Sequence, residues 1–319
     1  MRLSAVLLAY GADEPVRESL AALRVAVENV ADATELIVVL NRVSADLRPQ
    51  LAEAPDIVLI EPGRNLGFAG GVNAAIAGST GDWIALVNDD CIAEPTAITE
   101  LLSAGETAPS VGSVAAQVRF ADRPGTINSA GIQVDVLGIA TERLLGAPIS
   151  DSETSVTEVF GASGAAGLYR RSMLDEVGGF DESFFAYLED ADVAWRARMA
   201  GWRCVYAPRA VVHHHHSSSL GHGSPAKHFL VGRNRVRLLA KNATTAQLAR
   251  HAPRIVAYDL AYLTYAGLKT RSIAPLKGRL AGFATWGEDR AKVARRPVRL
   301  ARPSGIRHAL DRNRSYLSR

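Results

Sequence analysis

The 319-residue sequence has only two cysteines, Cys91 and Cys204, and they lie far apart. Small secreted domains that depend on a disulfide framework carry more cysteines at closer spacing, so a reducing cytoplasm fits this chain best. The sequence also lacks an uninterrupted apolar run near the ~20 residues that span a bilayer. We therefore expect a cytoplasmic protein that reaches a membrane only peripherally, at its cytoplasmic face.

The N-terminal region lacks the signatures of several other protein classes. Residues 10–15 contain one glycine and two acids, whereas a nicotinamide-dependent oxidoreductase needs a Gly-x-Gly-x-x-Gly turn after its first strand. The basic, Gly-rich signature expected of a nucleotidyltransferase is missing from the same turn. The apolar run before the turn, Leu3–Ala9, has no convincing cleavage site after it, so it predicts a buried strand instead of a signal peptide.

Enough apolar material is present for one large core, because hydrophobic residues make up 48% of the chain. The formal net charge is only +3, but basic residues gather near the C-terminus with few acids to balance them. This basic tail favours an anionic partner such as an anionic membrane surface. A solvated face of helices packed on the main domain explains it equally well. The tail residues are Arg290, Lys292, Arg295, Arg296, Arg299, Arg302 and Arg307.

Hydrophobic periodicity predicts a doubly wound α/β sheet. Short apolar runs at 3–9, 35–40, 56–60 and 83–87 are typical of buried parallel strands, and residues 16–30 repeat apolar side chains at helical spacing between the first two. Loops and short strands are expected at 120–160. Regular structure is expected to return at 164–170. A helix entry and helix at 184–198, a short strand at 204–207, a polar loop at 213–223 and mostly helix from 226 follow. We expect one domain at 1–225 and a helical, basic region at 226–319.

A Gly-rich segment, Asn65–Asn73, follows the third predicted strand and opens a helix. Glycines there allow backbone amides to approach a ligand closely, and a helix N-terminus favours an anion. A tight turn packed against the sheet accounts for the same residues. The segment alone is therefore a weak indication of a binding site.

Carboxylates follow the fourth predicted strand as Asn88-Asp89-Asp90. Open α/β sheets bind ligands at the carboxyl ends of their strands, and oxygen ligands there suit Mg²⁺ or Mn²⁺ bridging to substrate phosphates. The alternative is a helix N-cap. Asp89 could serve as the cap while Asp90 holds the metal.

Two further clusters of polar residues carry candidate chemistry. Glu189, Asp190 and Asp192 stand at a predicted helix start, where they are either a solvated first turn stabilised by the helix dipole or the source of a general base. Four histidines, 213–216, end a strand-like run. Only alternate ones, His213 and His215, share a face. No cysteine lies at a zinc-ligand spacing from them, so one imidazole completing an Asp-based metal site is the better interpretation.

The order and spacing of these elements resemble glycosyltransferase family 2, the inverting enzymes of the GT-A fold, and in particular its bacterial rhamnosyltransferase-like and cell-wall members. The resemblance covers about residues 1–242 and implies an α/β GT-A fold, with a doubly wound, mixed but mostly parallel sheet and a helical C-terminal extension. It rests on motifs that occur together, at 65–73, 88–90 (the family's DXD motif), 178–192, His213 and 233–237.

The resemblance implies roles for individual residues. Asp90 would bind Mg²⁺ or Mn²⁺, with His213 completing the site, and Asp89 would lie near the donor's ribose or diphosphate. Asp190 would be the base that deprotonates the acceptor hydroxyl, and Glu189 and Asp192 would orient the acceptor or the base. Other expected substrate-binding residues are Asn65, Gly67, Phe68, Asn73 and Arg233.

Two positions depart from the family pattern. Asn41 stands where the family usually has an aspartate that recognises the nucleoside, and an amide offers both a donor and an acceptor without charge. Tyr10 is followed by Gly11 where many relatives have a Tyr-Asn pair, and Tyr10 is expected to stack on the base.

These expectations combine into inverting transfer of a sugar from a UDP- or dTDP-sugar to an acceptor hydroxyl. The acceptor would be a glycan or a lipid-linked molecule in cell-wall, surface polysaccharide or glycolipid synthesis, and no nucleic acid is expected as a partner. The alternative is a non-catalytic relative that only binds nucleotide sugars. The loss of aspartate at position 41 favours that alternative, whereas Asp90, Asp190 and His213 oppose it.

Overall fold

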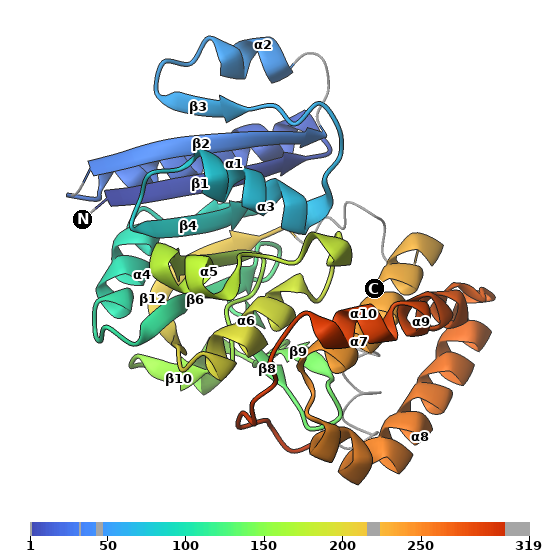
Figure 1. Cartoon of the computed structure of the whole chain (residues 1–319). Coiled ribbons are helices and arrows are strands. Elements are labelled where there is room, and N and C mark those ends of the chain that lie inside the picture. Colours follow the sequence, from blue (N-terminus) through green and yellow to red (C-terminus); the bar gives the residue numbers. More distant parts are fainter. Residues whose placement is uncertain (1, 32, 43–46, 216–223, 304–319) are drawn as a thin grey trace.

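The computed structural model describes residues 2–31, 33–42, 47–215 and 224–303. A ten-stranded sheet forms its centre (Figure 1), with the order β10-β12-β6-β11-β4-β1-β2-β3 and with β5 and β7 paired to β12 and β6. The strands are β1 (Arg2–Tyr10), β2 (Ala33–Arg42), β3 (Ile57–Ile60), β4 (Trp83–Asn88), β5 (Cys91–Ala93), β6 (Val111–Phe120), β7 (Ile127–Ser129), β10 (Thr157–Val159), β11 (Ala166–Arg170) and β12 (Arg203–His214); β8 (Ile132–Val134) and β9 (Ala140–Glu142) form a separate pair.

The sheet is mixed but mostly parallel, as predicted. Strand β1 runs parallel to β2 and β4, β2 to β3, and β6 to β12. Strand β11 is antiparallel to both of its neighbours, β4 and β6. Because Ala166 at the start of β11 pairs with Val87 near the end of β4, the chain just before β11 lies at the carboxyl end of β4.

Helices cover both faces of the sheet because the strands are apolar on both sides. Along β1, Leu3, Ala5 and Leu7 belong to one hydrophobic cluster, and Val6 and Leu8 belong to another, following the alternation of strand side chains. The first cluster includes α1 (Asp13–Glu28), α2 (Leu47–Ala52) and α4 (Ala97–Gly105), and the second includes α3 (Gly67–Gly78), α5 (Arg171–Val177) and α6 (Glu189–Met199).

The C-terminal region is helical and packs on the sheet domain. Its helices are α7 (Pro225–Asn242), α8 (Thr245–Thr270), α9 (Ala274–Ala284) and α10 (Trp286–Ala291). On α7, Leu238 and Leu239 share a hydrophobic cluster with Phe184 and Trp195 of the sheet domain. Within the described residues, no helix is both long and apolar enough to cross a membrane.

Three residues of the described basic tail contact the rest of the protein, whereas Arg296, Arg299 and Arg302 are exposed. Arg290 donates to the carbonyls of Ala240 and Ala243 at 3.2 Å, so it caps the C-terminus of α7, where a cation is favoured. Lys292 lies 3.0 Å from an Asp181 oxygen. Arg295 donates to the carbonyl of Lys241 at 3.3 Å. Arg307 lies outside the described residues.

Candidate active site

Three predicted site residues meet at the carboxyl edge of the sheet, where β1, β2 and β4 end. Leu8 pairs with Asn88, and Ala9 pairs with Leu40, so Tyr10, Asn41 and Asp89 follow at neighbouring strand ends. The backbone N–H of Tyr10 donates to the Asp89 carboxylate. This contact ties the first strand to the Asn88-Asp89-Asp90 motif.

Asp89 and Asp90 are both buried and have different partners. The backbone carbonyl of Asp89 accepts from Ser19 Oγ at 2.8 Å. Burial, followed by the charge of Asp90, raises the pKa of Asp89 to about 7, against the hydrogen bond from Tyr10. Asp90 Oδ1 accepts from Asn88 Nδ2 at 3.0 Å. Asp89 therefore helps to build the strand ends, while Asp90 presents an oxygen toward the histidine run.

The histidine next to Asp90 is His214, whereas His213 was predicted. His214 Nε2 lies 3.2 Å from Asp90 Oδ1. His213 points to the opposite face, where its Nε2 lies 3.0 Å from a Glu94 oxygen. His215 is exposed, and its backbone N–H donates to the Asp90 carbonyl at 2.9 Å. Alternation along the strand holds, but the face that meets Asp90 is the other one.

The donor set at Asp90 fits a divalent cation. One ligand atom each from Asp90, Cys91 and His214 lie within 4.8 Å of one another. His214 Nδ1 lies 2.9 Å from Asn128 Oδ1. In the tautomer with the proton on Nδ1, Nδ1 donates to that oxygen and Nε2 turns its lone pair toward Asp90. Because a lone pair and a carboxylate repel each other, a proton or a cation between them would stabilise this arrangement. Carboxylate and imidazole suit Mn²⁺ or Mg²⁺ better than the buried Cys91 thiol does.

Asn41 holds the Gly-rich loop with both ends of its amide, which explains why it is buried. Its Oδ1 accepts from Leu66 N–H at 2.7 Å, and its Nδ2 donates to the Gly67 carbonyl at 2.9 Å. Asn65 Oδ1 accepts from Gly67 N–H at 2.9 Å. Gly67 has a φ of +71°, and a Cβ there would lie 2.3 Å from the Phe185 carbonyl oxygen. Asn41 thus supports the Gly-rich loop, and its contact with the nucleoside stays a prediction.

Asn73 and Phe68 connect α3 to the segment before α6. Asn73 accepts from Phe180 N–H at 3.0 Å and donates to the Phe180 carbonyl at 2.8 Å, so its amide ties two chain segments together. Its contact with a substrate stays a prediction. Phe68 packs edge-on against Phe180 with ring centroids 6.3 Å apart. Phe68 also lies beside Gly164, where an added Cβ would meet its ring at 3.2 Å.

The loop before α6 has an unusual backbone, and the 233–237 motif holds it. Phe185, Tyr187 and Leu188 have φ values of 65°, 71° and 70°, a region that side chains other than glycine rarely adopt. The buried Asn234 Nδ2 donates to the carbonyls of Phe184, Ala186 and Tyr187 at 2.7–2.9 Å.

Arg233 supports the same loop from α7. Its Nη2 donates to the carbonyls of Ser183 and Phe184 at 3.1 and 2.8 Å. Its Nε donates to Asn234 Oδ1 at 3.0 Å. Arg233 therefore supports the backbone of the loop before Asp190, and its substrate contact stays a prediction.

Asp190 lies at the start of α6 with its carboxylate fixed by backbone amides. Oδ1 accepts from Ala191 N–H at 2.7 Å, and Oδ2 accepts from Gly164 N–H at 3.2 Å. Burial raises the pKa of Asp190 although both hydrogen bonds oppose the rise. Gly164 precedes Ala165, whose carbonyl accepts from Asn88 N–H at 2.9 Å. Asp190 is thus one short backbone link from the Asp89-Asp90 motif.

Glu142 joins Glu189 and Asp190 in a group that we call the acid cluster. Glu142 was not predicted as a site residue. Glu142 accepts from Ser129 Oγ and, at 3.1 Å, from Ser163 Oγ. Burial and then the charge of Asp190 raise the pKa of Glu142 to about 7. Glu189 is buried, its pKa is well above the usual range for the same two reasons, and its Oε2 has no hydrogen-bond partner among the described residues. Such proton-retaining carboxyls mark a candidate catalytic site.

Asp192 belongs to a different group with structural contacts, and its role at the acceptor stays a prediction. It is completely buried, and its oxygens contact Arg196 at 2.7 Å, Lys241 at 2.9 Å and Asn242 at 2.8 Å. Burial alone would raise its pKa, but the charges of Arg196 and Lys241 hold it below the usual value. Lys241 also binds Asp181 at 2.7 Å. We call Asp181, Asp192, Arg196, Lys241 and Asn242 the ion network.

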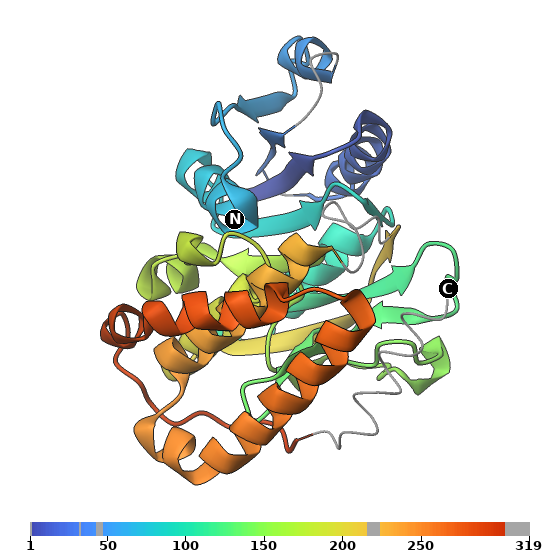
Figure 2. The same cartoon turned by 90° about the vertical axis from the view of Figure 1, so that its right-hand side faces the viewer.

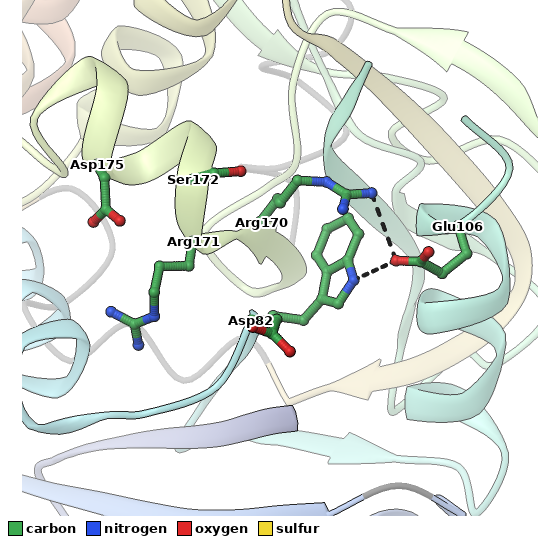
Figure 3. Close-up of a pocket in the computed structure, with 7 residues that line it drawn as sticks. Asp82, Glu106, Arg170, Arg171, Ser172 and Asp175 are labelled. Carbon is green, nitrogen blue, oxygen red and sulfur yellow. Dashed lines mark hydrogen bonds and ion pairs between the residues drawn. The ribbon is translucent and has the colours of Figure 1, made fainter. Parts of the chain in front are cut away.

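A separate pocket of about 460 Å³ lies at the opposite end of β4 (Figure 3). Arg170 stacks over the Trp83 ring at 4.1 Å, and Trp83 Nε1 donates to Glu106 at 2.6 Å. The Arg171 guanidinium donates to the carbonyls of Gly81 and Ser79. These groups satisfy one another, and the carboxyl edge remains the better candidate site.

Comparison with known proteins agrees with this geometry. Residues 2–227 match the profile described as Glycosyltransferase like family 2. The N-acetylglucosaminyl-diphospho-decaprenol L-rhamnosyltransferase of Mycobacterium tuberculosis is 31% identical over 251 residues, covering 71% of this chain and 80% of that enzyme. The poly-beta-1,6-N-acetyl-D-glucosamine synthase of Staphylococcus aureus is 25% identical over 168 residues, covering 53% of this chain and 39% of that protein.

Solved structures share the fold at low sequence identity. GalNAc-T7, solved with UDP, GalNAc and Mn²⁺, has a TM-score of 0.61 and 12% identity over 91% of this chain and 56% of its own. The mannosyltransferase PcManGT of Pyrobaculum calidifontis, solved with GDP-Man and Mn²⁺, has a TM-score of 0.53 and 16% identity over 99% of this chain and 80% of its own. By sequence profile and by its 31% identical relative, this chain belongs to glycosyltransferase family 2, and it has the GT-A fold.

Proposed function

We propose that the protein is an inverting, metal-dependent glycosyltransferase that uses Asp190 as its base. One observation carries the proposal: the Asp190 carboxylate is held at Gly164, and the adjoining Ala165 is hydrogen-bonded to Asn88 at the start of the Asp89-Asp90 motif. A base and a candidate diphosphate-binding motif at one sheet edge suit direct displacement at an anomeric carbon. Burial raises the pKa of Asp190 and so its affinity for a proton, as general-base catalysis requires.

In the proposed reaction an Asp190 oxygen takes the proton of the acceptor hydroxyl. The acceptor oxygen then forms a bond to the anomeric carbon from the face opposite the leaving group, and the bond from that carbon to the diphosphate oxygen breaks. The anomeric configuration therefore inverts. Gly164 and Ala191 orient the base through their N–H groups, and this preorganisation places the acceptor for attack.

Asp90 and His214 are the residues that would hold Mg²⁺ or Mn²⁺. A bound divalent ion supplies charge that stabilises the departing nucleoside diphosphate. Asn128 would orient His214 through Nδ1. Tyr10 stands at the end of β1 beside this motif, where its ring is proposed to stack on the base of a UDP- or dTDP-sugar.

The acceptor is proposed to be a lipid-linked glycan in cell-wall or surface polysaccharide synthesis. Support comes from the mycobacterial relative, whose name gives an N-acetylglucosaminyl-diphospho-decaprenol acceptor and a rhamnosyl group, and whose alignment covers 80% of its length. A rhamnosyl donor is accordingly the first candidate. Such an acceptor would place the active site at the cytoplasmic surface of the membrane.

The proposal is tested by a thermal-shift panel of UDP- and dTDP-sugars with Mn²⁺ or Mg²⁺, followed by turnover with acceptor. A metal-dependent rise in melting temperature with one nucleotide identifies the donor by mass action. Donor binding without turnover in the presence of acceptor would instead support the non-catalytic alternative.

A metal titration of turnover tests the assignment of His214. We expect the His214→Ala variant to require a much higher metal concentration than the wild type for half-maximal activity. The Asn128→Ala variant should require about 10–100-fold more metal than the wild type, because His214 then loses the residue that orients its ring. His213→Ala is the matched control, since its side chain faces Glu94. Equal metal requirements in the two histidine variants would refute this metal site.

A further inference from the structure

The outer face of α8 and α9 carries a concentration of exposed apolar side chains. Seven of the ten exposed large hydrophobic residues in the described chain fall between 256 and 283, and each of the seven is 45–77% exposed. Figure 2 shows α8 and α9 meeting near residues 271–273 and spreading across the side of the molecule nearest the viewer. The seven, which we call the apolar face, are Val256, Leu260, Leu268, Ile273, Leu276, Leu280 and Phe283.

Helical spacing places these residues in rows along both helices. Leu276, Leu280 and Phe283 follow one another by four and three residues, which puts them on one side of α9. On α8, Val256 and Leu260 are one turn apart, and Leu268 lies two turns further along. Phe283 stacks on Trp286 with ring centroids 5.8 Å apart, which enlarges the apolar area at the end of α9. A patch of this kind marks an interaction surface.

The charges around the apolar face are mostly positive, and the exposed Glu288 beyond the end of α9 is the exception. Between residues 245 and 287 the sequence has six lysines and arginines and a single acid, Asp259. Asp259 points inward, 2.8 Å from both Arg235 and Arg279. Arg279 is buried, so five exposed cations remain without a neighbouring exposed acid in that segment. They are Arg250, Arg254, Lys269, Arg271 and Lys277.

From this combination we infer that the apolar face docks on an anionic lipid bilayer. Apolar side chains enter the boundary between headgroups and acyl chains, and the flanking cations attract anionic headgroups. A protein partner would be expected to show a more mixed charge pattern at its docking site. This docking role rests on the proposed function and extends it, because a lipid-linked acceptor is presented at such a surface.

The docking face is connected to the active site by close packing. Gly278 of α9 approaches α7 so closely that a Cβ there would lie 2.1 Å from the Phe229 carbonyl oxygen. Helix α7 in turn carries Asn234, which holds the loop before Asp190. Docking through α8 and α9 would therefore fix the orientation of Asp190 relative to the membrane.

Co-sedimentation of the full chain with lipid vesicles tests the inference without requiring activity. We expect binding to vesicles of phosphatidylglycerol and phosphatidylethanolamine at low salt, and weak binding to phosphatidylcholine alone. The combined variant Leu260→Ser, Leu268→Ser, Leu280→Ser and Phe283→Ser should bind at least about 50-fold more weakly. A matched control changes three exposed valines elsewhere, Val25→Ser, Val58→Ser and Val156→Ser, and should bind like the wild type.

A charge variant separates the two contributions. Changing Lys269, Arg271 and Lys277 to glutamine should weaken binding by roughly fivefold per charge and reduce its dependence on salt. The inference is overturned if the wild type does not bind anionic vesicles, or if the serine variant binds as tightly as the control. It is also overturned if the apolar face binds a second copy of the chain, so that the wild type is a dimer and the serine variant is a monomer. Vesicle binding that arises only after residues 304–319 are removed would overturn it as well.

Turnover with a soluble, short-chain acceptor distinguishes this inference from the proposed function. The serine variant should retain normal turnover there, because its changes lie on the outer face of α8 and α9. Vesicle binding without turnover would contradict only the proposed function. Turnover without vesicle binding would contradict only the docking face.

Discussion

Two groups of carboxylates meet at the first turn of α6, and they differ in their partners. The acid cluster (Glu142, Glu189 and Asp190) is held by hydroxyl and backbone N–H groups, and the pKa of each of its members is raised. In the ion network, Asp181 and Asp192 contact Lys241 and Arg196 directly. Burial opposes ionisation in both groups, but only the network has cations that outweigh it, so the pKa values of its two acids fall.

The burial of an acid and its charged partners, more than its residue type, decide the role of that acid. A neutralised, fully buried carboxylate such as Asp192 cannot accept a proton from a substrate, but it fixes the position of α6. A half-buried carboxyl next to other carboxyls, such as Asp190, retains affinity for a proton and suits a base. Two residues in the same helical turn therefore have separate functions.

Asp190→Asn should have the largest effect on catalysis with no loss of stability. Removing the base is expected to lower kcat by about 10²–10⁴-fold. Because folding raises the pKa of Asp190, its ionised form opposes the folded state, and that cost appears as pH rises above the ordinary value. The melting temperature at pH 8 should thus stay level or rise. Near-normal kcat in a folded variant would exclude Asp190 as the base.

Asp192→Asn should show the reverse, a large loss of stability. The substitution leaves Arg196 and Lys241 buried with one charge fewer between them, and breaking a buried pair costs about 3–5 kcal/mol. Urea unfolding measures the change. The exposed Asp175→Asn is the control and should unfold like the wild type. An unaltered unfolding midpoint for Asp192→Asn would show that the ion network does not hold α6.

The sheet and the position of the main motifs could be predicted because they depend on local patterns. The four early strands and the helix between the first two are confirmed to within three residues at each end, since continuous apolar runs require burial on both faces. The predicted strand at 204–207 belongs to a much longer β12 (Arg203–His214). That strand contains an irregularity between Ala207 and Val211, which the sequence pattern does not show.

Roles that depend on register or on distant partners could not be predicted. Alternation separates His213 from His214, but pairing of β12 with β5 and β6 decides which of them meets Asp90. Asn41, Asn73 and Arg233 were expected at the substrate, and they bind backbone groups that lie far away in the sequence. Glu142 lies in the segment without clear periodicity, and only the fold brings it to Asp190.

Glu142→Gln should have the smallest effect and sharpen the comparison through its pH dependence. Folding raises the pKa of Glu142 from 4.5 to about 7, so the folded state retains a proton that the unfolded chain releases, and stability falls as pH rises through this range. Glutamine can still bond Ser129 and Ser163 but does not titrate.

The melting temperature of the glutamine variant relative to the wild type should therefore increase between pH 5 and pH 8, while the exposed Glu14→Gln shows no such trend. Because the charges of Glu142 and Asp190 act on each other, the acidic limb of kcat against pH should also move to lower pH with only a few-fold change in kcat at its maximum. The Glu142→Gln variant could instead match the Glu14→Gln control in both its pH profile and its melting-temperature difference. That result would show that the charge of Glu142 does not act on Asp190, and the acid cluster would then consist of Glu189 and Asp190 alone.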